Sequence, residues 1–182
     1  MTERAAAPAI KPLFSADRIT ARVDELAHDI ADLRLDDLVI VAVLTGSRIF
    51  ATDLVRALNG LGLRPEIDFL HLASYGDSTS SSGQVDIVRD VESALHGRDV
   101  VIADDILDSG RTLAFAKALL ERRGARTVRT CVLLDKQVPR AVAISPDLVG
   151  FRCPPVFVVG YGMDLADRYR ELPYIGELAP DT

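Results

Sequence analysis

Residues 100–112 read Val-Val-Ile-Ala-Asp-Asp-Ile-Leu-Asp-Ser-Gly-Arg-Thr, and the class of fold can be inferred from them. The first four residues have the length and composition of a strand that is buried on both faces. Acidic residues and a turn follow, and residues 113–123 then read as a helix that ends at Gly124. A buried strand that leads through a polar turn into a helix indicates an α/β protein.

The turn before this helix has the chemistry of a phosphate-binding loop. Gly110 allows the backbone to turn tightly and to approach a ligand closely. Successive N–H groups at the start of a helix suit an anion, and Ser109 and Thr112 can add hydroxyl donors. Arg111 either supplies positive charge or faces the solvent. We therefore expect this turn to hold a phosphate group.

Three acids precede the glycine. Asp104 and Asp105 follow the apolar run and can hold vicinal sugar hydroxyls, directly or through Mg²⁺. Asp108 lies between this acid pair and the phosphate turn, where it could reach a reacting base. The alternative is that Asp108 and Ser109 are helix caps and that the acid pair is a solvated turn. The apolar strand before the acids and the helix after them favour the functional interpretation.

The rest of the chain alternates between predicted helices and strands. After a candidate N-cap, Ser15, apolar residues recur at helical spacing at Ile19, Val23, Leu26, Ile30 and Leu33. A second helix is predicted at residues 49–58, with Asn59-Gly60 as its stop. Strands are predicted at residues 38–44, 66–73, 99–103, 128–134, 148–151 and 156–159. This order predicts right-handed crossovers and a mostly parallel central sheet with flanking helices.

Parallel sheets bind ligands at the carboxyl ends of their strands. Three junctions are therefore candidates, after Leu44, after Ala73 and after Ala103. The Ser-rich residues 78–83 cannot pack into a core and are predicted to form a mobile loop. The first dozen residues and residues 179–182 are expected to fray.

Length and composition limit the classes of protein to consider. The 182 residues suit one domain, and 48% hydrophobic residues are enough to form a core. A net charge of −6 argues against a broad nucleic-acid surface. No stretch approaches the length of a membrane span. Cys131 and Cys153 lack metal-site spacing, so we expect reduced thiols and a cytoplasmic protein.

Residues 100–112 resemble the signature of the type I phosphoribosyltransferases, which bind phosphoribosyl pyrophosphate (PRPP) with Mg²⁺. Further segments are similar to the hypoxanthine-guanine branch, and the resemblance runs from about Leu38 to Glu177. It implies a single domain over residues 1–182. The core would span about residues 36–150, and a small hood would come from about residues 1–20 and 151–182. The acids Asp104 and Asp105 would bind the ribose and metal.

The resemblance also implies roles for segments that would not stand out alone. Thr45 and Gly46 are similar to the family's pyrophosphate loop, although members often carry Lys or Arg where this chain has Thr45. Ser74 and Tyr75 are similar to its mobile lid. Lys136 would donate a hydrogen bond to the six-position oxygen of hypoxanthine or guanine. The amino group at the six-position of adenine is not an acceptor for this hydrogen bond.

A second matching segment covers residues 157–164. In the family's pattern Phe157 would stack on the purine, and the backbone carbonyl of Val158 would face its two-position. Asp164 would hold a second Mg²⁺ through water. Arg170 would reach the pyrophosphate.

The function that the resemblance implies is purine salvage. The enzyme would transfer the phosphoribosyl group from PRPP to hypoxanthine or guanine, with Asp108 as the catalytic residue and a homodimer or homotetramer as the assembly. The sequence does not rank the two bases. Two alternatives remain: a xanthine-preferring enzyme, and a nucleotide-sensing regulator of the same fold that binds RNA or DNA.

Overall fold

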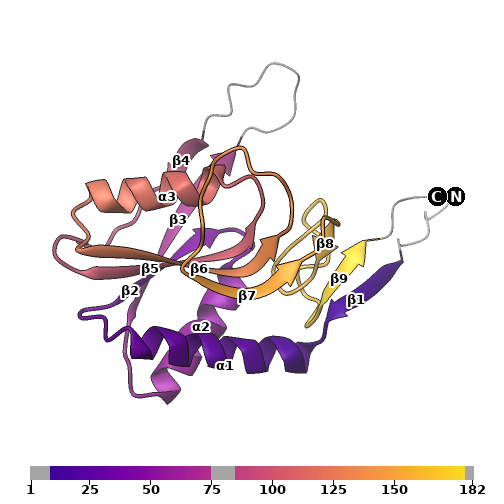
Figure 1. Cartoon of the computed structure of the whole chain (residues 1–182), viewed down its shortest axis with the longest axis horizontal. Coiled ribbons are helices and arrows are strands. Elements are labelled where there is room, and N and C mark those ends of the chain that lie inside the picture. Colours follow the sequence, from indigo (N-terminus) through magenta and orange to yellow (C-terminus); the bar gives the residue numbers. More distant parts are fainter. Residues whose placement is uncertain (1–8, 75–84, 179–182) are drawn as a thin grey trace, which may run out of the picture.

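The computed structural model describes residues 9–74 and 85–178 (Figure 1). Its centre is a six-stranded sheet with the strand order β4-β3-β2-β5-β6-β7. Only β4 runs antiparallel to its neighbour, which confirms the predicted mostly parallel sheet. The bounds of the strands are β2 Val39–Leu44, β3 Glu66–Ser74, β4 Val85–Arg89, β5 Asp99–Leu107, β6 Thr127–Lys136 and β7 Leu148–Cys153.

Three helices cover the two faces of this sheet. Helices α1 (Ala16–Asp32) and α2 (Arg48–Gly60) lie on one face, and α3 (Arg111–Arg122) lies on the other (Figure 1). The Ser15 side chain accepts a hydrogen bond from the backbone N–H of Arg18, so the predicted N-cap is confirmed. Leu33 was expected on the apolar face, but it lies at the helix end and is 40% exposed.

Each face of the sheet has its own hydrophobic core. Strand β2 contributes to both, because its side chains alternate between the faces. Ile40 and Ala42 pack toward α1 and α2, whereas Val39, Val41 and Val43 pack toward α3. This arrangement explains why the strand reads as a continuous apolar run.

A second, three-stranded antiparallel sheet joins the two ends of the described chain. Its order is β1 (Ile10–Phe14), β9 (Ile175–Leu178) and β8 (Val158–Val159). Ile10 pairs with Leu178, so the expectation that the whole first dozen residues fray is wrong. Phe14 also stacks on Phe151 of β7 at 4.4 Å between ring centroids. Strand pairing with β9 and the aromatic contact with β7 hold the segment from Ile10 to Phe14 in place. The composition of this segment alone did not indicate these contacts.

Two predicted boundaries are wrong in informative ways. Strand β5 does not end at Ala103 but continues to Leu107, because Asp104 and Ile106 pair with residues of β6. The two acids therefore lie inside a strand, and the turn is shorter than the sequence suggested. Helix α2 runs through Gly60, and the stop is at Gly62, whose φ of 85° suits a glycine after a helix.

The two cysteines, Cys131 and Cys153, are buried free thiols. Burial raises the pKa of Cys131 to about 12, so this thiol is an inert core side chain, as predicted. In the described parts of the chain, no helix combines the length and the apolar character needed to cross a bilayer.

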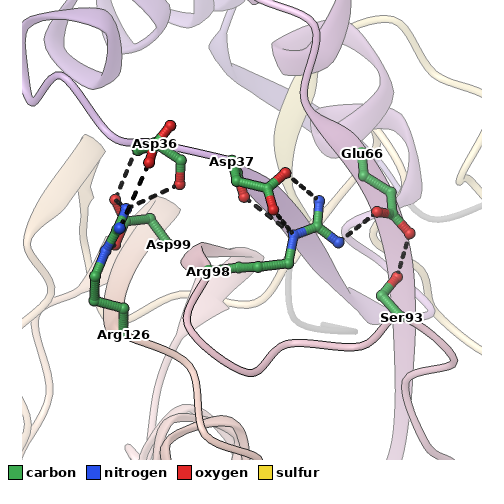
Figure 2. A network of polar contacts seen from close by, with 7 residues as sticks. All are labelled: Asp36, Asp37, Glu66, Ser93, Arg98, Asp99 and Arg126. Carbon is green, nitrogen blue, oxygen red and sulfur yellow. Dashed lines mark hydrogen bonds and ion pairs between the residues drawn. The ribbon is translucent and has the colours of Figure 1, made fainter.

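A polar network binds the amino ends of the central strands together (Figure 2). Asp99, at the start of β5, is 4% exposed. Its carboxylate accepts hydrogen bonds from Arg126 at 2.6 and 2.9 Å, from the Thr127 hydroxyl at 2.8 Å and from the Asp36 backbone N–H at 2.8 Å. These contacts hold the pKa of Asp99 well below its usual range, the Arg126 hydrogen bonds being the largest cause.

A neighbouring arginine extends this network to β3. Arg98 forms ion pairs with Asp37 at 2.8 Å and with Glu66 at 2.6 Å (Figure 2). Glu66 also accepts a hydrogen bond from the Ser93 hydroxyl at 2.6 Å. The amino edge of the sheet is thus fixed by interactions within the protein. The carboxyl edge, where the phosphate turn lies, is the edge available to a ligand.

We predict that Asp99→Asn lowers the free energy of unfolding by about 2 kcal/mol at pH 7, because it removes the buried charge that Arg126 contacts. The folded-state pKa of Asp99 lies below the unfolded value, so its stabilisation is present above pH ~4 and is lost as the pH falls below that value. Urea unfolding at pH 7 and pH 3 measures both effects. The difference in the free energy of unfolding between the wild type and the variant should be smaller at pH 3 than at pH 7.

Asp36→Asn is the matched control, because the Asp36 carboxylate is 84% exposed and lies 3.6 Å from Arg126. It should change the free energy of unfolding by less than about 0.5 kcal/mol. Equal effects of the two substitutions would contradict the role assigned to Asp99.

Candidate active site

A cavity of about 320 Å³ opens at the carboxyl edge of the central sheet. Its walls come from the ends of β2, β3, β5 and β6 and from the segment before and after β8. The lining residues are Leu44, Thr45, Gly46, His71, Leu72, Asp105, Ile106, Lys136, Phe157, Val158, Met163, Asp164 and Arg170. The fold therefore brings the predicted pyrophosphate, purine and acidic residues to one place, although they are far apart in the sequence.

At Gly46, parts of the cavity wall from different strands are in close contact. A Cβ atom built on Gly46 would lie 1.9 Å from Oδ2 of Asp105, and one built on Gly162 would lie 2.2 Å from the Gly46 carbonyl oxygen. Neither position has room for a side chain. The loop after β2 is thus packed between an acid of β5 and the segment after β8.

The acid pair lies in an environment that opposes its charge. Asp104 is 5% exposed, and Asp105 is partly buried against Gly46. Burial raises the pKa of Asp104 well above its usual value, and the adjacent Asp105 carboxylate adds to this effect. Burial also raises the pKa of Asp105, although Arg170 works in the opposite direction. A pair of carboxyl groups held this way favours a bound cation or hydrogen-bond donor.

The predicted phosphate turn lies directly before helix α3. Gly110 is the N-cap of α3 with φ of 81°, and it offers no side chain to the first turn of the helix. The Ser109 carbonyl accepts a hydrogen bond from the Val142 backbone N–H at 3.1 Å, and the Val142 carbonyl lies 2.4 Å from where a Gly110 Cβ would be. The Ser109 hydroxyl accepts from the Arg111 backbone N–H at 3.4 Å. Arg111 is exposed, and Thr112 is partly buried beside it.

Lys136 connects this turn to the cavity. Its ammonium group lies 3.0 Å from Oδ2 of Asp108, and its side chain is 16% exposed, whereas the Asp108 side chain is 51% exposed. Lys136 is the last residue of β6, and Asp108 follows the end of β5, the neighbouring strand. The two residues that the sequence assigns to the purine and to catalysis therefore form an ion pair.

The segment after β8 carries a second ion pair. Arg170 lies 2.9 Å from Oδ1 of Asp164 and 3.1 Å from Asp167, and it donates to the Gly162 carbonyl at 2.8 Å. The Asp164 carboxylate also accepts from the Asp167 backbone N–H at 2.8 Å. These contacts fold the segment back on itself and hold Asp164 and Arg170 at the cavity wall.

A buried tyrosine fixes this segment to helix α2. Tyr161 is 7% exposed, and its hydroxyl donates to Oδ2 of Asp53 at 2.7 Å. Burial and the Asp53 carboxylate together raise the Tyr161 pKa above its usual value. Because α2 begins just after Gly46, this hydrogen bond links two walls of the cavity.

The predicted purine residues differ in exposure. Phe157 is 50% exposed at the cavity wall, so its ring is available to a ligand, whereas Val158 is 7% exposed. Ser74 is the last residue of β3, and Tyr75 lies outside the described residues, as does the Ser-rich loop. The lid prediction is therefore untested.

Several predicted residues lie outside the cavity wall, and several residues at the site were not predicted. Asp104, Asp108 and residues 109–112 do not line the cavity, although Asp108 contacts Lys136, which does. Sequence reasoning missed His71, Asp53 and Tyr161. Tyr161 lies within the matched segment, but nothing in the sequence indicates that it pairs with Asp53.

The family model for the phosphoribosyl transferase domain matches residues 12–166. The chain belongs to this family. The hypoxanthine-guanine phosphoribosyltransferase of Bacillus subtilis is 42% identical over 171 residues, which cover 93% of each protein. The enzyme of the same name from Mycobacterium tuberculosis is 44% identical and is covered to 85%, with 92% of this chain aligned. The resemblance inferred from the motifs is thereby confirmed.

Solved structures of phosphoribosyltransferases share the fold. The crystal structure of a hypoxanthine phosphoribosyltransferase from Staphylococcus aureus superposes with a TM-score of 0.86 at 36% identity, covering 93% of this chain and 91% of that one. The chain also matches the bifunctional protein TilS/HprT of Listeria innocua at 44% identity over 94% of its own length, but it spans only 26% of that protein.

We predict that Tyr161→Phe lowers the free energy of unfolding by about 1 kcal/mol, because it removes the hydroxyl that contacts Asp53 and keeps the ring. The folded-state pKa of Tyr161 is raised, so the stabilisation by the hydroxyl is complete below pH ~10 and decreases above it. Urea unfolding at pH 7 and above pH 10 measures the difference. Tyr174→Phe is the control, because the Tyr174 hydroxyl forms no hydrogen bond with other described residues. An equal decrease in the free energy of unfolding for Tyr174→Phe would contradict the stabilising role of the hydrogen bond from Tyr161 to Asp53.

Proposed function

We propose that the protein transfers the 5-phosphoribosyl group from PRPP to hypoxanthine or guanine, giving IMP or GMP and pyrophosphate in purine salvage. The observation that carries this proposal is that the Thr45-Gly46 loop, Asp105, Lys136 and Arg170 line one cavity. The names of the full-length relatives from Bacillus subtilis and Mycobacterium tuberculosis support the same substrates.

The phosphate turn would hold the 5′-phosphate of PRPP. Its amide groups at the start of α3, with the hydroxyls of Ser109 and Thr112, are the donors for this group. Gly110 keeps the turn tight, and Arg111 adds positive charge near it. Binding energy from this remote phosphate orients the reacting ribose carbon.

The base would bind between Lys136 and Phe157. Lys136 donates to the six-position oxygen, Phe157 stacks on the ring, and the Val158 carbonyl faces the two-position. Asp108, which contacts Lys136, accepts or relays the proton of purine N7 as the new bond to ribose forms. The ribose acquires oxocarbenium character as pyrophosphate leaves, so exclusion of water matters, and Ser74 and Tyr75 would contribute a lid.

Mg²⁺ is the cofactor that this donor set fits. Within residues 9–74 and 85–178 no group of three metal-ligating side chains is present, but Mg²⁺ is commonly held by one or two carboxylates together with substrate phosphates. The raised pKa values of Asp104 and Asp105 reflect a pair of acids that a divalent cation would stabilise as carboxylates. Asp164 would hold a second ion, and bound Mg²⁺ would neutralise the diphosphate as it leaves.

Arg170, Thr45 and Gly46 would contact the pyrophosphate. Arg170 lies at the cavity wall in contact with Asp164, and the Gly46 backbone lies beside Asp105. The whole chain would act as one domain, with a core of about residues 36–150 and a hood from about residues 1–20 and 151–182. We further propose a cytoplasmic homodimer or homotetramer.

Two alternative functions, a xanthine-preferring enzyme and a nucleic-acid-binding regulator, differ from this proposal in what they require of the protein. Xanthine shares the six-position oxygen, so only an assay distinguishes a xanthine-preferring enzyme. A nucleic-acid-binding regulator would need free basic residues, and the candidates lie near the end of α3. There Arg123 contacts Asp90, and Arg126 contacts Asp99 and Asp36. These ion pairs favour the enzyme.

We predict Mg²⁺-dependent release of pyrophosphate from PRPP with hypoxanthine or guanine as acceptor, and much slower turnover with adenine. The reason is that Lys136 has donors only, which match an oxygen at the six-position. A panel of the four bases hypoxanthine, guanine, xanthine and adenine, with and without Mg²⁺, is the measurement. Absence of turnover with every base, together with tight RNA binding, would favour the regulator.

We predict that Asp108→Asn lowers kcat by about 10²-fold with little change in KM for PRPP, because it removes the proton acceptor but not the phosphate turn. Steady-state kinetics across pH 6–9 is the measurement. Asp24→Asn, an exposed acid on α1, is the control. Turnover of Asp108→Asn at the wild-type rate across this pH range would rule out the role of Asp108 as the base.

A further inference from the structure

The basic side chains that line the cavity are not equally available to a ligand. Lys136 contacts Asp108 at 3.0 Å, and Arg170 contacts Asp164 at 2.9 Å. His71 also lines the cavity, and its imidazole ring has neither a hydrogen bond nor an ion pair with any residue in the described ranges. A histidine that served only to pack a core would be expected to have its ring nitrogens hydrogen-bonded.

The sheet places His71 beside the loop that contains Thr45 and Gly46. In the parallel pairing of β2 and β3, His71 is the partner of Leu44, the residue just before this loop. Leu70, the residue before His71, belongs to the core on the α3 side together with its β2 partner Val43, so the alternation of a strand directs His71 to the opposite face, where α2 begins. Leu44 and His71 both line the cavity.

The loop itself provides no basic side chain. Thr45 offers a hydroxyl, Gly46 offers its backbone, and Ser47 is buried with its hydroxyl donating to the Val43 carbonyl. A diphosphate carries several charged oxygens and needs more donors than this loop supplies. The nearest basic side chain on the adjoining strand is His71, since it is paired with the residue before Thr45.

We propose that His71 is a binding residue for the diphosphate of the phosphoribosyl donor, and that it supplies from β3 a nitrogen donor that the Thr45 position lacks. This inference rests on the proposed function. A histidine ring has at least one N–H donor in its neutral form and two when protonated, so it can contact a phosphate oxygen in either state. Unlike Lys136 and Arg170, it breaks no ion pair of this site when it does so.

The test compares His71→Ala and His71→Asn with the wild type. The Ala variant should raise KM for PRPP, and Kd for inorganic pyrophosphate with Mg²⁺, by about tenfold, as expected for one hydrogen bond to a charged group. KM for hypoxanthine should stay within about twofold. The Asn variant keeps an N–H donor and should recover part of the loss. His28→Ala, at an exposed histidine on α1, is the matched control.

A second-site variant makes the test more specific. If His71 compensates for the neutral side chain at position 45, then Thr45→Lys in the His71→Ala background should restore much of the pyrophosphate affinity. Unchanged KM for PRPP and unchanged pyrophosphate binding in His71→Ala would overturn the proposal. So would equal increases in the KM values of PRPP and hypoxanthine, which would indicate a structural role.

The experiment also separates this inference from the proposed function. If the wild-type protein transferred phosphoribose to no purine base, the proposed function would fail. Calorimetric titration with pyrophosphate and Mg²⁺ would still decide whether His71 binds a diphosphate. Normal transfer by His71→Ala with wild-type KM for PRPP would remove only the role of His71.

Discussion

The architecture of the cavity depends on close packing at Gly46, where the Asp105 side chain of β5 and the backbone at Gly162 both approach the loop after β2. The carboxylate of Asp105 occupies the space on one side of this glycine, and Gly162 lies against its carbonyl oxygen on the other. A side chain at Gly46 would displace the Asp105 carboxylate, and one at Gly162 would push the segment after β8 away from the loop after β2. The hydrogen bond from Tyr161 to Asp53 maintains the same contact from the helix that follows the loop. Close packing at two glycines thus sets the position of residues drawn from three parts of the chain.

The buried acids at the two edges of the central sheet lie in opposite electrostatic environments. At the amino edge, Asp99 is buried as a carboxylate, because Arg126 and backbone and hydroxyl donors stabilise its charge. At the carboxyl edge, Asp104 and Asp105 are buried beside each other with raised pKa values, because burial and mutual repulsion oppose their charge. The first arrangement stabilises the fold. The second is costly without a ligand, which is a common property of functional sites.

In this structure the lysine and the arginine of the site are each paired with an acid. Lys136 pairs with Asp108, and Arg170 pairs with Asp164. Under the proposed function, the substrates exchange these ion pairs for contacts to the base and the diphosphate, so binding replaces interactions instead of adding charges to an apolar space. His71 is different, because it has no partner to lose among the described residues. For this reason a substitution of His71 tests the proposed diphosphate contact without breaking an ion pair of the site.

The sequence by itself determined the class of fold, the parallel sheet and the family, since apolar runs, caps and the acid-glycine signature act over short distances along the chain. It also named most of the residues that line the cavity. Only the tertiary structure decided that β5 continues to Leu107, that Ile10 pairs with Leu178, and that His71 lies beside the Thr45 loop. Strand pairing, register and contacts such as that between Tyr161 and Asp53 join residues distant in sequence, and local patterns carry no information about such partners.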